Sequence, residues 1–185
     1  GYNNTLGIKN LDYLIADKNL INENELNLYK EKILFLPKIW NVFAPPEILP
    51  DIELEEKNNN SVFTFCSFNN YQKISNRTVN VWSQILKHTN SQLLLKTSHA
   101  GDIDDLKNNI LDKFINNGVS RDQIIFLKRE KEIHDHLKLY NKADIALDTF
   151  PYPGVTTSFE AIMMGVPVLT MKGFNMNSRC GESIN

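Results

Sequence analysis

The sequence predicts an α/β protein built on an open, doubly wound parallel sheet of the Rossmann-like class. Two observations support this prediction. From residue 61 onward, short apolar runs of strand length alternate with amphipathic stretches of helix length. The runs are nearly continuous in apolar residues, as expected for strands that are covered on both faces. Regular alternation of this kind places helices on both faces of a parallel sheet.

The elements of this sheet follow one another along the chain. The apolar run 62–66 is the first expected strand, and the helix after it carries an apolar face that includes Trp82. The second helix ends at Asn117-Gly118, which is a typical C-terminal stop signal. The expected strands are 62–66, 92–96, 123–127, 143–148 and 165–170, and the expected helices are 77–88, 103–117, 131–140 and 156–164.

Residues 1–45 form a separate and incomplete unit in the predicted organisation. The short elements expected in this unit are a segment at 13–16, a polar helix near 22–33 and an apolar run at 33–37. They supply too little apolar surface for a core of their own. Prolines followed by charged and Asn residues predict a linker at 46–60. The α/β unit then occupies 61–185, and both ends are expected to continue in a longer parent protein.

Composition narrows the class of protein. The 185 residues are 42% hydrophobic and 23% charged, as in soluble globular domains. A net charge of −2 without a basic patch argues against a nucleic-acid or membrane-surface partner. No apolar stretch is long enough to span a membrane. The two cysteines are far apart and no Cys/His spacing resembles a zinc site, so a reducing, cytoplasmic location is expected.

Loops at the carboxyl ends of the strands are the expected ligand site, because ligands of open α/β sheets bind there. The loop after the first strand carries Asn69, Asn70 and Lys73. A lysine at this edge could neutralise a phosphate. The alternative is a polar connection with a solvated lysine.

The segment that opens the helix 131–140 supplies Lys131, His134 and His136. Histidines at i and i+2 point away from each other on a helix, so they do not form a metal-binding pair. One of them could face the cleft, and a surface or helix-capping histidine is the alternative.

The loop before the helix 156–164 carries the strongest chemical pattern. Prolines and Gly154 shape a tight loop, and Thr156 and Thr157 open the helix. Free backbone N–H groups and two hydroxyls at a helix start suit a diphosphate. Glu160, one turn further on, could accept hydrogen bonds from ribose hydroxyls. The alternative is ordinary threonine capping with a solvated glutamate.

These motifs resemble the catalytic region of the O-linked N-acetylglucosamine transferase and SPINDLY-like glycosyltransferase family. The resemblance spans nearly the whole chain, and the segments that carry it are Gly1-Tyr2, Leu36-Pro37, Phe68-Asn69-Asn70 with Lys73, Asp148 to Glu160, Met164 to Val168 and Ser178-Arg179. It implies a two-lobed GT-B type enzyme. Residues 1–45 would end the N-terminal catalytic lobe, and 61–185 would be the C-terminal nucleotide-sugar-binding lobe, incomplete at its C-terminus. It further implies inverting transfer without a metal or other cofactor.

The resemblance also implies a role for each matching residue. Lys73 would be the catalytic group that neutralises the diphosphate, with Asn70 where the family has a nucleotide-contacting glutamine. It places Lys131 and His134 at the uracil, Thr156 and Thr157 at the phosphates, and Glu160 at the ribose. The other donor-binding positions it implies are Asn69, Asn70, Lys73 and Gly154. Two departures are visible: Val155 stands where animal members have a histidine, and Glu160 replaces an aspartate.

The implied partners are a UDP-sugar donor, a protein acceptor, an upstream catalytic lobe and tetratricopeptide repeats in the parent chain. The expected reaction transfers N-acetylglucosamine from UDP-N-acetylglucosamine to Ser or Thr hydroxyls, and this chain alone is expected to be inactive. The sequence leaves three alternatives to this function open. They are a GDP-fucose-using O-fucosyltransferase, a non-catalytic nucleotide-sugar-binding module, and an epimerase of similar layout.

Overall fold

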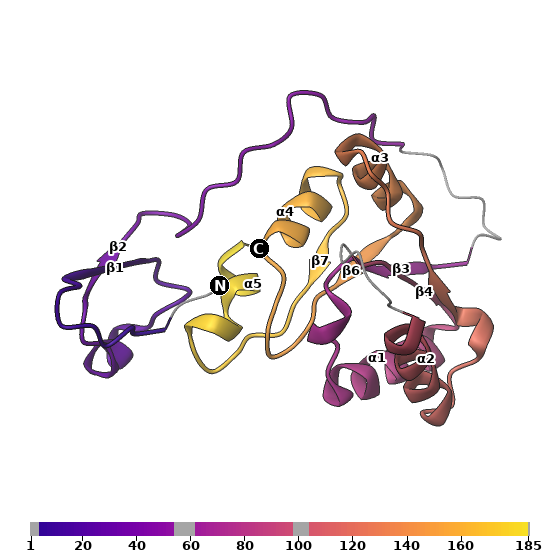
Figure 1. Cartoon of the computed structure of the whole chain (residues 1–185), viewed down its shortest axis with the longest axis horizontal. Coiled ribbons are helices and arrows are strands. Elements are labelled where there is room, and N and C mark those ends of the chain that lie inside the picture. Colours follow the sequence, from indigo (N-terminus) through magenta and orange to yellow (C-terminus); the bar gives the residue numbers. More distant parts are fainter. Residues whose placement is uncertain (1–3, 54–61, 98–103, 185) are drawn as a thin grey trace.

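The computed structural model describes residues 4–53, 62–97 and 104–184 (Figure 1). Its main sheet has five strands in the order β5-β4-β3-β6-β7, all parallel. The strands are β3 (Thr64–Ser67), β4 (Gln92–Leu95), β5 (Ile124–Phe126), β6 (Ile145–Leu147) and β7 (Val168–Leu169). The order reverses at β3, which confirms the doubly wound prediction.

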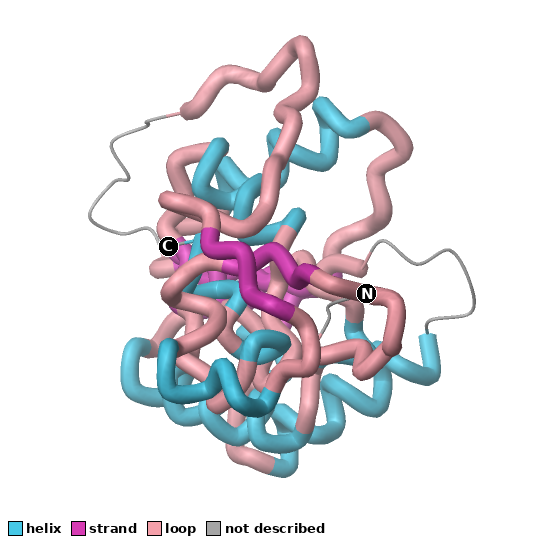
Figure 2. The backbone as a smooth tube through the Cα atoms, turned by 90° about the vertical axis from the view of Figure 1, so that its left-hand side faces the viewer, coloured by secondary structure: helices cyan, strands magenta, loops and turns pink. Residues whose placement is uncertain are grey.

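Helices cover both faces of this sheet. They are α1 (Asn76–Thr89) and α2 (Asp104–Asn116) on one face, and α3 (Ile133–Lys138) and α4 (Thr156–Met163) on the other. The side chains of successive strand residues point to opposite faces of the sheet. Phe65 packs in the cluster with α1 and α2, and Cys66 packs in the cluster with α3 and α4. In Figure 2 the N-terminal part of the chain lies in front, and helices lie above and below the strands behind it.

Helix α1 illustrates how the sequence sets these boundaries. The Ser75 hydroxyl accepts the N–H of Thr78 and caps the N-terminus, while Asn90 ends the helix in the left-handed region with φ 48°. Between these ends, Val79 and Trp82 are buried against the sheet. The predicted helix 131–140 is shorter in the structure, because α3 passes into the 3₁₀ turn Leu139–Lys142. Residue 103, the first of another predicted helix, lies outside the described residues.

The N-terminal part contains a second sheet of two parallel strands, β1 (Tyr13–Ala16) and β2 (Lys32–Phe35). The polar helix predicted near 22–33 is wrong, since only the 3₁₀ turn Glu23–Leu28 forms there. This turn has no buried residue that could hold a longer helix against a core. The chain then re-enters extended structure as β2.

Segments from both ends of the chain share one apolar cluster. Leu14 and Leu20 pack with Val155 and Met176 in this cluster, which α5 (Cys180–Ile184) also joins. A buried ion pair reinforces it, because Arg179 donates two hydrogen bonds to Glu25 at 2.5 and 2.6 Å and a third to the Leu20 carbonyl at 3.1 Å. The N-terminal unit therefore completes its packing with residues from the end of the chain.

The segment after β2 runs over α4 toward α3 (Figure 1). Phe43 stacks on Phe159 of α4 with ring centroids 5.0 Å apart. Further along, the Asn141 amide donates to the carbonyl of Asp51 at 2.9 Å. Residues 46–53 of the predicted linker thus contact the α/β unit, and the rest of that linker lies outside the described residues.

Candidate functional site

The carboxyl edge of the sheet is where the strand order reverses. β3 lies between β4 and β6, so the segments after β3 and β6 leave neighbouring strands at the same edge. In doubly wound sheets this reversal opens a crevice in which ligands bind. The two segments meet here, because Asn69 Nδ2 donates to Asp148 Oδ1 at 3.5 Å.

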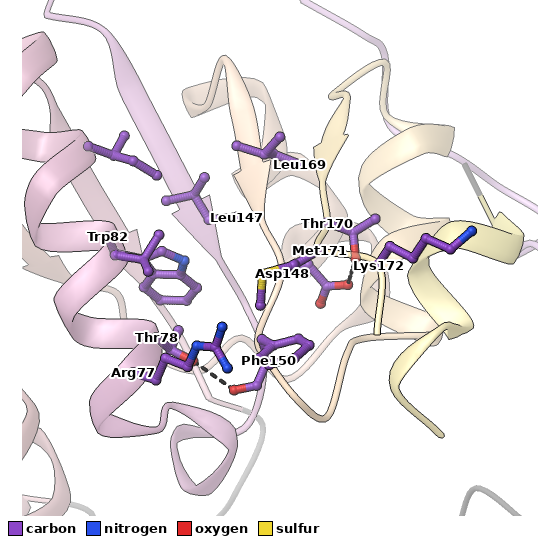
Figure 3. Close-up of a pocket in the computed structure, with 12 residues that line it drawn as sticks. Arg77, Thr78, Trp82, Leu147, Asp148, Phe150, Leu169, Thr170, Met171 and Lys172 are labelled. Carbon is purple, nitrogen blue, oxygen red and sulfur yellow. Dashed lines mark hydrogen bonds between the residues drawn. The ribbon is translucent and has the colours of Figure 1, made fainter. Parts of the chain in front are cut away.

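Asp148 shapes the loop after β6. It is buried, and its Oδ1 accepts the N–H groups of Thr149 at 2.9 Å and of Gly154 at 2.6 Å. Its Oδ2 accepts the Thr170 hydroxyl at 2.8 Å, which ties the loop to the end of β7 (Figure 3). Burial raises the pKa of the Asp148 carboxyl, and these hydrogen bonds oppose the rise. The carboxyl group therefore fixes the turn from Asp148 to Gly154.

The same loop is tied to the start of α1. The Phe150 carbonyl accepts the hydroxyls of Ser75 at 3.0 Å and Thr78 at 2.9 Å, and Figure 3 shows the second of these bonds. Beside this contact, between α1 and the strands β6 and β7, lies a cavity of about 340 Å³ whose apolar lining includes Trp82 and Leu147. None of the site residues predicted from the sequence lines this cavity.

Lys73 extends from the β3 loop onto the loop after β6. Its Nζ donates to the carbonyl of Pro153 at 3.0 Å and to Asn69 Oδ1 at 3.4 Å, and it lies 4.4 Å from the ring centre of Tyr152. Burial lowers the pKa of the Lys73 amine, while the charge of Asp148 raises it. The amine is therefore held against the loop that leads into α4.

This loop enters α4 with two threonines. The N-cap residue Val155 makes no side-chain capping bond, and among the described residues nothing accepts a hydrogen bond from the backbone N–H of Thr156 or Thr157. The Thr157 hydroxyl donates to Asn69 Oδ1 at 3.2 Å. A Cβ at Gly154 would collide with that hydroxyl and lie 3.2 Å from Asn69 Oδ1. Glycine at 154 thus lets the two loops and the helix start meet.

A cavity of about 430 Å³ adjoins this helix start, and both Thr156 and Thr157 line it. It lies between α3, α4 and the segment after β5, and its lining residues are Phe68, Lys96, Arg129, Glu130, Lys131, Glu132, Ile133, His136, Thr156, Thr157 and Glu160. Its polar lining and its position beside free backbone N–H groups suit a polar, anionic ligand.

The cavity holds a chain of hydrogen-bonded side chains. Glu160 is only 6% exposed, and its Oε2 pairs with His136 Nε2 at 3.0 Å and accepts the Tyr140 hydroxyl at 3.3 Å. The other imidazole nitrogen of His136, Nδ1, lies 2.7 Å from Nζ of the buried Lys96. These residues come from four separate elements, and their side chains fix one another's orientation.

A model of the family described as glycosyl transferase family 41 matches residues 53–184. The chain belongs to glycosyl transferase family 41. Within the part of the family 41 chain that the structure describes, no group of three or more His, Cys, Asp or Glu residues could hold a metal ion. No helix there combines the length and the hydrophobicity needed to cross a bilayer.

Relatives of this family 41 chain include plant proteins. It is 31% identical over 185 residues to the probable UDP-N-acetylglucosamine–peptide N-acetylglucosaminyltransferase SPINDLY of Eustoma exaltatum subsp. russellianum, a match that covers 100% of this chain and 20% of that protein. The corresponding SPINDLY protein of Arabidopsis thaliana is 35% identical over 175 residues, with 94% and 19% covered. The chain thus spans about a fifth of the length of these curated relatives.

A solved structure gives the same assignment. A mutant of the O-GlcNAc transferase of Thermobaculum terrenum superposes with a TM-score of 0.88 at 31% identity, covering 98% of this chain and 34% of that one. The family resemblance and the Rossmann-like GT-B fold predicted from the sequence are therefore confirmed.

The structure gathers most of the predicted site residues of this family 41 chain. Asn69, Lys73, Gly154 and Thr157 meet where the loops converge. The cavity is lined by four of them: Lys131, Thr156, Thr157 and Glu160. Asn70 has a local role, because its Oδ1 accepts the Gln72 N–H and caps the short turn that carries Lys73.

The histidine in the cavity is His136 and not His134, which the sequence interpretation had favoured. His134 is exposed and contacts Asp135 at 3.5 Å. His136 is partly buried and lines the cavity, where it contacts Lys96 and Glu160, whereas His134 remains at the surface. Their i, i+2 spacing shows that only one can face inward, but not which one.

Sequence reasoning also missed Lys96 and Tyr140. Lys96 was the last residue of the predicted strand 92–96, and its burial brings a charged group to the end of an apolar strand. A lysine that closes an otherwise apolar run is the signal that could have identified it. Tyr140 gave no such signal, because an aromatic residue near a helix end normally belongs to the core.

Proposed function

We propose that this chain is the donor-binding part of an inverting glycosyltransferase that transfers N-acetylglucosamine from UDP-N-acetylglucosamine to Ser or Thr hydroxyls of proteins. One observation carries the proposal: the Lys73 amine lies against the loop that opens α4, beside the free backbone N–H groups of Thr156 and Thr157. A lysine and a helix N-terminus together form a site for a diphosphate.

The chemistry of glycosyl transfer explains why such a site is needed. The bond between the sugar C1 and the β-phosphate oxygen breaks, and negative charge develops on the departing UDP. The Lys73 ammonium and the N–H groups at the start of α4 stabilise this charge without a metal. Each such preorganised donor contributes about 3 kcal/mol to transition-state stabilisation. The acceptor hydroxyl attacks C1 from the side opposite the phosphate and releases its proton to solvent, so the configuration at C1 inverts.

The remainder of the donor fits the adjacent cavity. With the diphosphate at Thr156 and Thr157, the nucleoside extends along α4 to Glu160, one turn further in. The Glu160 carboxylate then accepts hydrogen bonds from the ribose hydroxyls. The base lies at the outer part of the cavity near Lys131, and His136 takes the place of His134 in this assignment.

The wider organisation follows the same proposal. Residues 1–45 are the end of an N-terminal catalytic lobe, 46–60 are the linker, and 61–185 are the nucleotide-sugar-binding lobe. A two-stranded parallel sheet with Tyr13 and Ile15 exposed is consistent with a larger lobe, since parallel strands are normally covered on both faces. The protein acceptor, tetratricopeptide repeats and a cytoplasmic location belong to the whole protein and remain predictions.

Calorimetric titration of the full-length protein with UDP, GDP and UDP-N-acetylglucosamine tests the donor assignment. We expect UDP and UDP-N-acetylglucosamine to bind and GDP to bind at least tenfold more weakly. Preference for GDP would instead support an O-fucosyltransferase. A radiolabelled transfer assay on a protein acceptor completes the test. UDP binding without transfer would indicate a binding module, and release of an epimer would indicate an epimerase.

A further inference from the structure

Lys96 occupies an unusual position for a charged residue. It directly follows β4, its backbone N–H donates to the Ser67 carbonyl at 3.3 Å, and only 4% of its surface is exposed. Its amine lies 5.8 Å from the ring centre of Phe68 and 2.7 Å from His136 Nδ1. An amine buried at this depth loses its hydration, so its remaining contacts must compensate. The imidazole of His136 is one of those contacts.

The chemistry of these groups determines where the hydrogens lie. A lysine ammonium has three donors and no acceptor, so His136 Nδ1 must offer its lone pair to Lys96. The ionised Glu160 carboxylate can only accept, so His136 Nε2 must carry the hydrogen. The imidazole between them is then neutral, with its single hydrogen on Nε2. A positive amine and a negative carboxylate balance each other across it.

A second proton arrangement has the same total charge. In it, a neutral Lys96 amine accepts from a positively charged imidazolium. A lysine ordinarily holds its proton about four pH units more strongly than a histidine, which favours the first arrangement. Burial lowers the pKa of the Lys96 amine, and the charge of Glu160 raises it again. We take the ammonium form, and the experiment below separates the two.

Both hydrogen bonds to Glu160 end on the same oxygen. His136 Nε2 and the Tyr140 hydroxyl contact Oε2, at 3.0 and 3.3 Å. Among the described residues no hydrogen bond ends on Oε1, so this oxygen keeps its lone pairs for a ligand in the cavity that Glu160 lines. A carboxylate held in this way keeps one oxygen fixed and presents the other in a set direction.

We infer that Lys96 is a positioning residue: by fixing His136 as the neutral Nε2–H tautomer, it orients the Glu160 carboxylate so that Oε1 accepts a hydrogen bond from the sugar hydroxyl of a bound nucleotide. This inference rests on the proposed function for its ligand, but the tautomer itself does not depend on any ligand. Lys96 lines the same cavity, and in this scheme it acts on the ligand through His136 and Glu160.

Nuclear magnetic resonance tests the tautomer in the ligand-free protein. With ¹⁵N-labelled histidine, two-bond ¹H–¹⁵N correlations show which ring nitrogen is protonated, and a His136→Gln variant identifies the signal. We expect Nε2 to be protonated and Nδ1 to be bare. Lys96→Met should give a mixture of tautomers, and Lys96→Arg, which keeps a charged donor, should restore the single form. An imidazolium or an Nδ1–H form of His136 in the unmodified protein overturns the inference.

Calorimetry with UDP and 2′-deoxy-UDP tests the consequence. We expect the unmodified protein to prefer UDP, and Lys96→Met to reduce that preference about tenfold, the effect of one hydrogen bond to a charged group. Lys73→Met should weaken both ligands equally and leave the preference unchanged. If UDP binds and Lys96→Met retains the full preference, the inference fails while the proposed function stands. If the unmodified protein binds no UDP, the proposed function fails and the tautomer spectrum alone decides about Lys96.

Discussion

Two lysines on the ligand-binding edge of the sheet differ in what holds their amines. Lys73 is carried by a short turn, and it donates to a backbone carbonyl and a side-chain amide, at 3.0 and 3.4 Å. Lys96 closes a central strand, and its amine contacts an imidazole that is itself bonded to a carboxylate. The Lys73 amine donates to oxygens of the two loops and lies within the influence of the Asp148 charge, whereas the Lys96 amine contacts the His136 imidazole. The first arrangement is suited to receive an anion, and the second to hold a neighbour in place.

Replacement of Lys73 should give the largest effect. In the full-length protein we expect Lys73→Ala to reduce the rate of sugar transfer by about two to three orders of magnitude, because a preorganised charge at the leaving group is lost. The fold should persist, since the amine is bonded to loop atoms and not to a core residue. Steady-state transfer kinetics and circular dichroism measure the two outcomes.

Lys142→Ala is the matched control, because Lys142 is an exposed lysine of the same lobe. Its transfer rate should equal that of the unmodified protein. Normal turnover by Lys73→Ala would remove the distinction between the two lysines and with it the proposed catalytic role.

Replacement of Gly154, in the loop that Lys73 contacts, should give the next largest effect. A methyl group at this position would collide with the Thr157 hydroxyl and crowd Asn69. We expect Gly154→Ala to weaken UDP binding about thirtyfold, because overpacking of this kind costs about 2 kcal/mol and shifts the start of α4. Calorimetry measures the affinity, and circular dichroism checks that the variant keeps its fold. Unchanged affinity would show that the helix start is not in contact with the diphosphate.

The contrast between the two lysines also explains what the sequence could and could not reveal. Asn69, Lys73 and Gly154 lie in two segments that follow predicted strands, and Thr157 opens the helix after the second of them. Parallel topology alone brings such segments together. Their assembly was predictable once the alternation of strands and helices had been read. The apolar periodicity that defines α1 was equally visible in the sequence.

The cluster of Lys96, His136 and Glu160 could not be predicted from the local sequence in this way. Lys96, His136 and Glu160 come from a strand end and two helices, and only their side-chain packing shows that they touch. The rotation of α3 about its own axis decides whether His134 or His136 faces the cavity. Contacts with residues distant in sequence, here Lys96 and Glu160, accompany that rotation, so the local pattern could not distinguish the two histidines. The same limit applies to the 3₁₀ turn that replaced the helix predicted near 22–33.

Replacement of Glu160, which Lys96 positions through His136, should give a smaller effect that is confined to recognition of the sugar hydroxyl. Glu160→Gln keeps the shape of the side chain but removes its charge and one acceptor. We expect UDP to bind about tenfold more weakly, while 2′-deoxy-UDP changes less, because a hydrogen bond to a charged group contributes about 1.5 kcal/mol. Calorimetry with both ligands measures the difference. An equal loss for both would indicate that Glu160 supports the cavity without contacting the sugar hydroxyl.

The smallest effect should come from the anchor that joins the loop after β6 to α1. The Thr78 hydroxyl donates to the Phe150 carbonyl at 2.9 Å, and Ser75 donates to the same carbonyl at 3.0 Å (Figure 3). Thr78→Val keeps the volume and removes one of these bonds, so we expect a loss of about 1 kcal/mol in the free energy of unfolding. Because Ser75 still holds the carbonyl, UDP affinity should change less than twofold. Denaturant titration and calorimetry measure the two quantities, and a large loss of affinity would mean that the loop depends on both anchors to keep Pro153 under the Lys73 amine.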